Sequence, residues 1–390
     1  MLVDLHAHYP MRVIGDIRPD SALRELRRIR GRPTLRDGAR ALILRIASTF
    51  FSHRNPFSGY RVTVPGLRAG GVGVAISVLT RPFDEVAVGL PYASPPDSAY
   101  FAGLLGDLNA VEAEVATHGR DEIRIVHGAA ELEQALADGA TALVHGVEGG
   151  FSLGDGSDEI ARNVATLAGR GVAYITLAHL LYRQVATNSN ALPFLSEGLY
   201  RRIFPQPENE GLTERGVAAL RAMVAERVAL DVSHMRADAL RETFELLDGE
   251  LDPECRYPLL ATHVGYRFGG QEYMLDEPTI LQIKRRDGAI GLILAQHQLN
   301  DGLRSEDTAS LDDSLAVLFA HIDKIAAITG GYRHLAIGTD LDGFIKPTLT
   351  GLDAMADMAK LEQALETKYG ENAKLIASDN ALRVLRQLWS

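Results

Sequence analysis

The sequence predicts a (β/α)8 barrel, a closed sheet of eight parallel strands alternating with helices, in one domain spanning residues 1–390. Three observations predict it. Short apolar runs rich in β-branched residues recur along the chain, amphipathic patterns lie between them, and a histidine or carboxylate directly follows many of the runs. Because the runs are short and uniformly apolar, they are typical of strands buried on both faces. We find neither a linker nor an internal repeat.

The eight expected strands cover residues 3–7, 74–79, 142–147, 173–177, 228–232, 259–261, 289–294 and 335–338. Helices are expected between them, as at 157–170 and 213–226, where apolar residues recur at three- and four-residue spacing. The run 124–126 is followed by a helical pattern at 130–137. We expect it to be an accessory strand, because a ninth barrel strand would break the eightfold alternation.

Two segments are longer than ordinary loops. Residues 10–70 follow the first strand and contain helical patterns at 21–29 and 39–51, and residues 180–211 follow the fourth strand. Insertions after barrel strands lie over the face where barrel enzymes build their active sites. We therefore expect both to act as lids or substrate walls, although 10–70 could instead pack against a partner subunit.

Composition narrows the class of protein. The formal net charge of -11 opposes binding to nucleic acid, and no basic cluster is interleaved with aromatic residues. The single cysteine, Cys255, excludes an internal disulfide and a cysteine-based zinc site, which fits a reducing compartment. The first strand begins near residue 3, where a signal peptide would lie, and no apolar run is long enough to cross a bilayer. We expect a cytoplasmic protein that binds neither nucleic acid nor membranes.

Side chains that can bind metal or carry protons stand where the expected strands end: His6, His8, Glu148, His179, His234, His263, Asp340 and Asp342. In a parallel barrel these ends meet at one face, where catalytic groups gather. His6 and His8 are two residues apart in a strand, so we expect their imidazoles to point the same way. His145 alternates with Val147 rather than with Glu148, and we interpret it as structural.

Neutral imidazoles and carboxylates suit zinc and similar divalent ions, but four histidines and one glutamate exceed the needs of one tetrahedral ion. Glu148 would explain the surplus by bridging an ion held by the first two histidines and another held by His234 and His263. Many two-metal barrel hydrolases use a carboxylated lysine as the bridge, but the first lysine here is Lys284, after the sixth strand. We therefore expect two zinc ions, or other divalent ions, bridged by Glu148.

The same strand ends carry longer motifs: Val-His-Gly-Val-Glu-Gly-Gly at 144–150, Ile-Thr-Leu-Ala-His at 175–179, Gly-Leu-Thr-Glu-Arg-Gly at 211–216, Leu-Asp-Val-Ser-His at 230–234, Ala-Thr-His at 261–263 and Ile-Gly-Thr-Asp-Leu-Asp-Gly at 337–343. With these motifs the chain resembles the membrane (renal) dipeptidase family of two-zinc (β/α)8 hydrolases. Residues 379–385 are similar to the closing helix of that family. The matching segments span almost the whole chain in the family's order.

The resemblance implies a role for each matching position. Two zinc ions would share Glu148, one held with His6 and His8 and the other with His234 and His263. His179 would contact the substrate carbonyl or the oxyanion of the tetrahedral intermediate. Asp340 would bind the amino group of the substrate and protonate the leaving nitrogen, and Asp342 would support the turn. The resemblance also makes a homodimer a reasonable expectation.

Two departures from the family pattern concern the substrate. The first motif is His-x-His where the family usually has His-x-Asp, so His8 removes one negative charge and favours an anionic ligand or a more acidic bound water. After His263 the family carries an arginine and an asparagine that grip the C-terminal carboxylate of the dipeptide, but residues 271–277 contain no arginine. Arg267 is a candidate replacement for binding substrate, or a solvated loop side chain, and Arg183 is a second choice.

The leading hypothesis is a zinc-dependent dipeptidase in which a hydroxide bridging two zinc ions attacks the peptide carbonyl. His179 would stabilise the oxyanion, and Asp340 would protonate the departing amine. The first alternative is an amidohydrolase with the same metal core that acts on an N-acyl amino acid, a lactam or a cyclic amide, which the missing arginine favours. The second is a catalytically inactive metal-binding relative, and the complete ligand set speaks against it.

Overall fold

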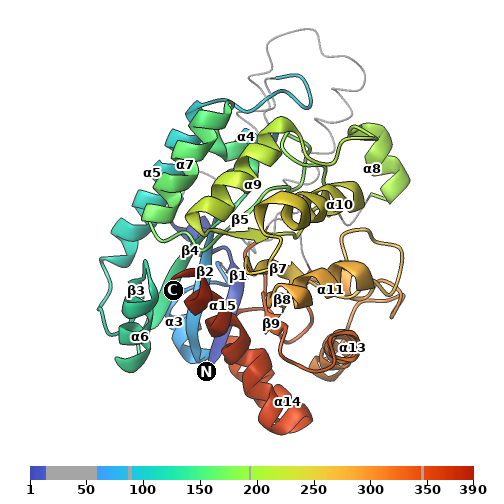
Figure 1. Ribbon diagram of the computed structural model, residues 1–390. Coiled ribbons are helices and arrows are strands. Elements are labelled where there is room, and N and C mark those ends of the chain that lie inside the picture. The colour runs from blue at the N-terminus through green and yellow to red at the C-terminus, as the bar shows by residue number, and fades with distance from the viewer. Residues whose placement is uncertain (15–58, 87–89, 193–194, 344–346) are drawn as a thin grey trace.

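A computed structural model describes residues 1–14, 59–86, 90–192, 195–343 and 347–390. Eight parallel strands close into a barrel with helices around it, which confirms the predicted fold (Figure 1). The strands are β1 Leu2–Ala7, β2 Val72–Thr80, β4 Thr141–Glu148, β5 Tyr174–Thr176, β6 Ala229–Asp231, β7 Leu259–Val264, β8 Ala289–Leu292 and β9 Leu335–Ile337. Their order is β2-β1-β9-β8-β7-β6-β5-β4, and β2 pairs with β4 to close the ring.

The short strand β3 (Ile123–Ile125) lies outside this ring. It pairs with β4 from Ile123↔Thr141 to Ile125↔Leu143, whereas β5 pairs with the later residues 146–148 of β4. Strand β3 therefore pairs only with the first residues of β4, and β5 pairs with the later residues along the same edge. The structure confirms it as the accessory strand that the sequence predicts.

The helices of the described residues include α3 Val64–Ala69, α4 Pro82–Val86, α5 Ala99–Val115, α6 Ala129–Ala137, α7 Ser157–Gly169, α8 Glu197–Ile203, α9 Glu214–Glu226, α10 Ala237–Leu246, α11 Glu277–Arg285, α12 Gln296–Leu299, α13 Leu311–Thr329, α14 Met358–Tyr369 and α15 Asn380–Leu388. Side-chain caps fix several starts: Thr213 accepts from Gly216 N before α9, and Asp276 accepts from Thr279 N before α11. The predicted helices at 157–170 and 213–226 are confirmed. Those expected at 21–29 and 39–51 lie outside the described residues.

The apolar core has two parts. Inward-facing residues of the strands, such as Val3, Val74 and Val144, fill the barrel together with the apolar face of α15. Outward-facing residues of the strands pack against the surrounding helices in a larger cluster. Helix α15 lies near the N-terminal end of β1 (Figure 1), so it covers the opposite end of the barrel from the strand ends that carry the histidines. This arrangement leaves the C-terminal face of the barrel for chemistry.

An extra residue in β1 determines where the first two histidines point. Asp4 pairs with Ala75 of β2, but Ala7 pairs with Ser77, so three steps along β1 match two along β2. Leu5 belongs to the interior cluster, and strict alternation would send the next side chain outward. The added residue, a bulge, turns His6 inward as well.

Strand β7 has the same irregularity. Ala261 pairs with Ile290 and Val264 with Leu292, so β7 again contains one extra residue. The Thr262 carbonyl turns toward β8 and the residue that follows β9, where a Cβ on Gly291 or Gly338 would lie 2.1 or 1.6 Å from its oxygen. Only glycine fits at those two positions, and their fit lets β7 present His263 to the interior.

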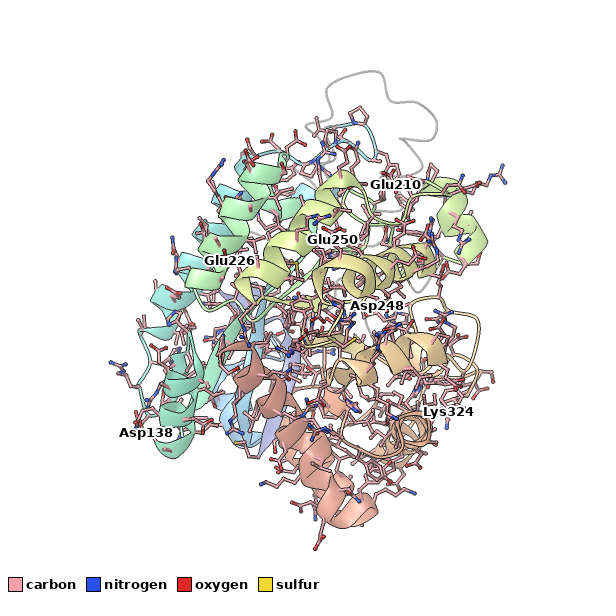
Figure 2. All side chains as sticks on the ribbon, in the orientation of Figure 1. Asp138, Glu210, Glu226, Asp248, Glu250 and Lys324 are labelled. Atoms are coloured by element: carbon pink, nitrogen blue, oxygen red, sulfur yellow. The ribbon has the colours of Figure 1, made fainter. Side chains whose placement is uncertain are left out.

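Charged side chains cover the outside of the molecule (Figure 2). The exposed Asp138, Glu226 and Glu250 lie at or just beyond the ends of α6, α9 and α10 and extend into solvent. Among the described residues, no helix is long and apolar enough to span a membrane.

Candidate metal centre

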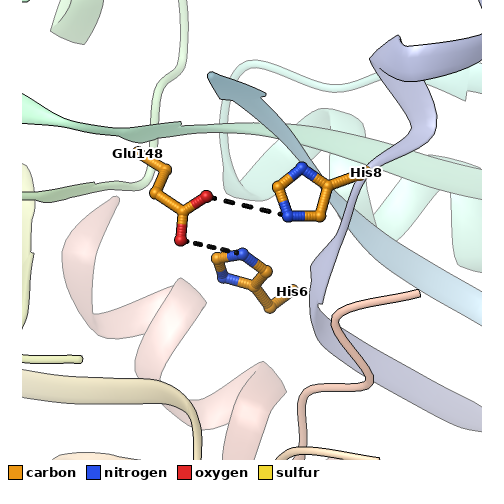
Figure 3. Close-up of side chains that lie close together, drawn as sticks. All are labelled: His6, His8 and Glu148. Atoms are coloured by element: carbon orange, nitrogen blue, oxygen red, sulfur yellow. Dashed lines mark ion pairs between the residues drawn. The ribbon is translucent and has the colours of Figure 1, made fainter. Parts of the chain in front are cut away.

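The first group of potential ligands joins β1 to the end of β4. His6 Nε2 lies 3.5 Å from Glu148 Oε1, and His8 Nε2 lies 3.7 Å from Glu148 Oε2 (Figure 3). All three side chains are buried. The two imidazoles therefore face the carboxylate that the sequence predicts as a bridge.

The second group comes from β6 and β7. His234 Nε2 and His263 Nε2 lie 3.3 and 3.4 Å from Glu148 Oε1, and 3.0 Å from each other. His234 adopts a left-handed backbone conformation, with φ of 66°. Such a conformation is costly for a residue other than glycine and is found mainly at functional sites. The structure thus brings the four predicted histidine ligands around Glu148, the fifth predicted ligand.

Unpaired polar atoms show that the group suits cations. His6 Nε2 is buried and has no hydrogen-bond partner. The Nε2 atoms of His234 and His263 face each other, although only a protonated nitrogen can donate to the other. His6, His8 and Glu148 form one set of ligand atoms within 4.8 Å of one another, and Glu148, His234 and His263 form another. Imidazole nitrogens and carboxylate oxygens are the ligands that zinc-like divalent ions bind, so these residues fit two such ions.

Burial and neighbouring groups set the protonation states of three of the predicted ligands. Burial lowers the pKa of His263 to about 4 and holds the pKa of His6 well below its usual range, so both imidazoles are neutral at neutral pH. Burial alone would raise the pKa of Glu148, but the charge of His179 and the hydrogen bonds from His179 and His234 hold it well below its usual range. His6 and His263 therefore offer neutral nitrogens beside an ionised carboxylate, and these groups bind a cation without first releasing a proton.

A second layer of hydrogen bonds orients two of the imidazoles. The Thr262 hydroxyl donates to Asp231 Oδ2 (2.7 Å), so its lone pairs accept from Nδ1 of His6 (2.8 Å) and of His263 (2.9 Å). With the proton on Nδ1, each ring presents a bare Nε2 to the centre. Asp231 accepts from Ser233 and Thr176 as well, which saturates its oxygens. Asp231 therefore holds the Thr262 hydroxyl in the orientation that accepts from the two imidazoles.

His179 lies between two carboxylates. Its Nε2 is 3.2 Å from Glu148 Oε2, and its Nδ1 is 2.7 Å from Glu85 Oε2 on α4. Burial lowers the pKa of His179, but the Glu148 and Glu85 charges outweigh it and raise the pKa well above its usual value. Arg183 donates to the backbone carbonyls of Asp84 and Glu85 and so anchors α4. His179 is therefore a fixed hydrogen-bond donor at the edge of the candidate centre.

Asp340 and Asp342 occupy the turn after β9. Asp340 Oδ1 lies 3.0 Å from His8 Nε2, and its backbone has a left-handed φ of 54°. A Cβ on Gly343 would lie 1.9 Å from Asp340 Oδ1, so glycine is required beside it. Asp342 accepts backbone N–H bonds from Arg61 and Val62, at 2.9 and 2.8 Å. Asp342 thus ties the end of the first insertion to this turn, while Asp340 faces the site.

A cavity opens over these groups and is lined by His8, Glu148, His179, Leu180, Ala191, His234, His263, Tyr273, Gln298 and Asp340. The predicted ligands other than His6, the donor His179 and the carboxylate of Asp340 therefore line one cavity. This arrangement can bind divalent cations, hold a carbonyl-containing substrate against them and exchange a proton with it.

Comparison with known proteins identifies the family. The family model of the membrane dipeptidases, peptidase family M19, matches residues 24–389. The chain belongs to the membrane dipeptidase family. This confirms the resemblance seen in the sequence motifs and implies that the chain uses a divalent metal.

Three individual proteins are similar to this chain over most of its length. An uncharacterized protein in the pqqA 5' region of Klebsiella pneumoniae is 25% identical over 287 residues, which cover 72% of this chain and 94% of that protein. A metallo peptidase from Rhodobacter sphaeroides, liganded with a phosphinate mimic of the dipeptide L-Ala-D-Ala, has a TM-score of 0.67 at 19% identity over 100% of this chain and 99% of its own. The family M19 dipeptidase AC has a TM-score of 0.66 at 20% identity over 100% and 98%. The two structures share the barrel fold with this chain.

The two arginines proposed to replace the carboxylate-binding arginine of the membrane dipeptidase family are not among the residues that line the cavity. Arg267 donates to the carbonyls of Met274 (2.8 Å) and Glu272 (2.9 Å) and stabilises its own loop. Arg183 is committed to α4. A substrate-binding role for Arg267 stays a prediction, and in this structure its guanidinium is engaged by the backbone.

Three residues near the site were missed by sequence reasoning: Glu85, Tyr273 and Gln298. Glu85 is an ordinary acidic residue in the first turn of a helix, and no sequence signal separates it from the adjacent Asp84. Tyr273 donates to His263 O at 2.8 Å and lines the cavity from a loop without a strand-end motif.

His145, interpreted as structural, is buried outside the barrel with Nε2 3.5 Å from Glu112 Oε1.

Proposed function

We propose that the protein is a zinc-dependent dipeptidase that hydrolyses the peptide bond of a dipeptide with two zinc ions bound. The observation that carries this proposal is the position of Glu148, whose two oxygens face both sets of histidine nitrogens. His6 and His8 would hold one ion with it, and His234 and His263 the other. When bound, such ions activate a water molecule as nucleophile and polarise the scissile carbonyl.

The protein side chains supply the remaining steps. His179 donates a hydrogen bond from Nε2 to the carbonyl oxygen of the substrate and stabilises the negative charge that develops there. Glu85 keeps the opposite nitrogen, Nδ1, protonated and the ring in place. Asp340, next to His8, binds the substrate amino group and carries a proton to the leaving nitrogen.

The relative from Rhodobacter sphaeroides supports a dipeptide substrate, because its bound ligand mimics L-Ala-D-Ala. A second candidate is an amidohydrolase that acts on a different small amide. It is favoured by the cavity lining, which among the described residues presents the neutral Gln298 and no lysine or arginine.

Substitution of the bridge tests the proposal. Glu148→Gln keeps the size of the side chain but removes its charge, so zinc content and dipeptide turnover should both fall while the thermal midpoint of the apo protein changes little. Glu226→Gln, at an exposed glutamate on α9, is the matched control (Figure 2). Full activity of the metal-free wild-type protein would overturn the proposal.

A substrate panel separates the two candidates. L,L- and L,D-dipeptides should be assayed beside N-acyl amino acids, lactams and cyclic amides. Turnover of dipeptides at micromolar to millimolar KM supports the dipeptidase, whereas turnover of only the other amides supports the second candidate. A zinc-free protein with no activity on any amide would indicate a relative that has lost hydrolysis.

A further inference from the structure

Gln298 lines the cavity, and its side-chain oxygen makes no hydrogen bond within the protein. It is 4% exposed and lines the candidate active-site cavity, and its Oε1 atom is buried without a hydrogen-bond partner. Buried polar groups are nearly always paired in native proteins, so an unpaired one at a cavity wall points to a ligand. An amide offers an acceptor and a donor together.

The contrast with Gln296 in the same short helix, α12, supports this. Gln296 Nε2 donates to Thr348 O (2.7 Å), and its Oε1 accepts from Thr308 N (2.7 Å), so both ends of its amide hold the fold together. Gln298 makes neither kind of contact through Oε1. Two glutamines two residues apart therefore have different tasks, and only Gln298 faces the cavity.

The backbone around Gln298 is held from three sides. Gln296 N donates to Pro347 O (3.0 Å), Gln271 Nε2 donates to His297 O (2.6 Å), and His321 Nε2 contacts Leu299 O (2.9 Å). The backbone that carries Gln298 is therefore in place before a ligand arrives, which reduces the entropy lost on binding. Gln298 also follows β8, between β7 with His263 and β9 with its Asp340 turn.

We propose that Gln298 selects substrates by pairing with a neutral amide group, such as the carboxamide of a dipeptide amide or the ring amide of a lactam, rather than with a free carboxylate. Its acceptor needs an N–H, which a carboxylate lacks, while its NH2 can donate to the carbonyl of the same amide. This inference rests on the proposed function and specifies which substrate group, a neutral amide, Gln298 would bind next to the scissile bond.

Paired substrates test it. The zinc-loaded enzyme should be assayed with L-Ala-D-Ala and L-Ala-D-Ala-NH2, as wild type, Gln298→Leu and Gln298→Glu. Because one neutral hydrogen-bonding pair is lost, Gln298→Leu should lower kcat/KM for the amide about tenfold, while kcat/KM for the free acid stays within about twofold. Gln298→Glu keeps the shape but loses the donor, and should reduce turnover of the amide as well. Gln363→Leu, at an exposed glutamine on α14, is the control. An equal effect of Gln298→Leu on both substrates would overturn the proposal.

Binding without turnover separates this inference from the proposed function. N-acetyl-D-alaninamide carries the neutral amide, and calorimetry measures its Kd for wild type and Gln298→Leu. About tenfold weaker binding to the variant supports Gln298 as the amide partner even if no peptide is hydrolysed, and in that case only the proposed function fails. Equal Kd values overturn the role of Gln298 even in an active dipeptidase.

Discussion

Replacing Glu85 by glutamine should slow turnover about 10- to 100-fold and leave the zinc content unchanged. Glu85 Oε2 accepts from His179 Nδ1 at 2.7 Å, and Oε1 accepts from Leu181 N at 2.8 Å. A glutamine has one acceptor oxygen for these two donors, so one bond is lost. A hydrogen bond to a charged group contributes about 1.5–3 kcal/mol, and about 1.4 kcal/mol changes a rate tenfold. The loss should appear in kcat more than in KM, because His179 acts on charge that develops in the transition state.

The pH profile gives a second readout for the same variant. The Glu148 and Glu85 charges raise the pKa of His179 above its usual value despite burial, so the imidazolium persists to higher pH than in an ordinary histidine. Without the Glu85 charge this pKa falls, and the alkaline limb of kcat should move to lower pH. Asp84→Asn is the matched control, since the neighbouring Asp84 carboxylate pairs with Arg81 instead. The reasoning is refuted if Glu85→Gln keeps kcat within about twofold of wild type, or if Asp84→Asn has the same effect.

Three further substitutions probe the supports of the site. Thr262→Val removes the acceptor shared by two imidazoles, so zinc should bind about 10- to 100-fold more weakly in a chelator competition; an unchanged Kd would contradict this role. Burial lowers the pKa of His321 to about 4, against about 6.5 in the unfolded chain. Between these two pH values the unfolded chain binds a proton that the folded protein does not. The free energy of unfolding should therefore fall by roughly 3 kcal/mol over this interval as the pH is lowered, at about 1.36 kcal/mol per pH unit. His321→Gln, which can still pair with Leu299 O and Tyr266 N, should lose this dependence in urea titrations; a parallel loss in both proteins would argue against it. His8→Asp adds a negative charge to the site, so the acid limb of kcat/KM should move to higher pH, and an unmoved limb would exclude a ligand role for His8.

The strand-end pattern could be predicted from sequence because it depends on local order alone. A short apolar run predicts a buried strand, and the residue after it lies at the C-terminal face of the barrel. Glu148 and His234 meet in the structure for that reason. The bulges in β1 and β7 could not be predicted, because they depend on the register with neighbouring strands. Strict alternation places Leu5 and His6 on opposite faces, yet both face the interior.

The residues that sequence reasoning missed act through tertiary contacts. Glu85 reaches His179 from a helix that begins after β2, and the two are far apart in the chain. Gln298 differs from Gln296 only in what surrounds its amide. Neither distinction exists in residue types or spacing. Such residues are distinguished only by the hydrogen bonds that their side-chain atoms make or lack in the folded chain.

The metal content of the purified protein tests the central claim most directly. After zinc loading and dialysis, elemental analysis should find two zinc ions per chain in the wild type, and Glu148→Gln should lose zinc from both sites because one carboxylate serves both sets of histidines. His234→Ala should lose zinc from one site and retain the ion held by His6 and His8. The account would be contradicted by a wild type with no bound zinc, or by a Glu148→Gln variant that still holds two ions.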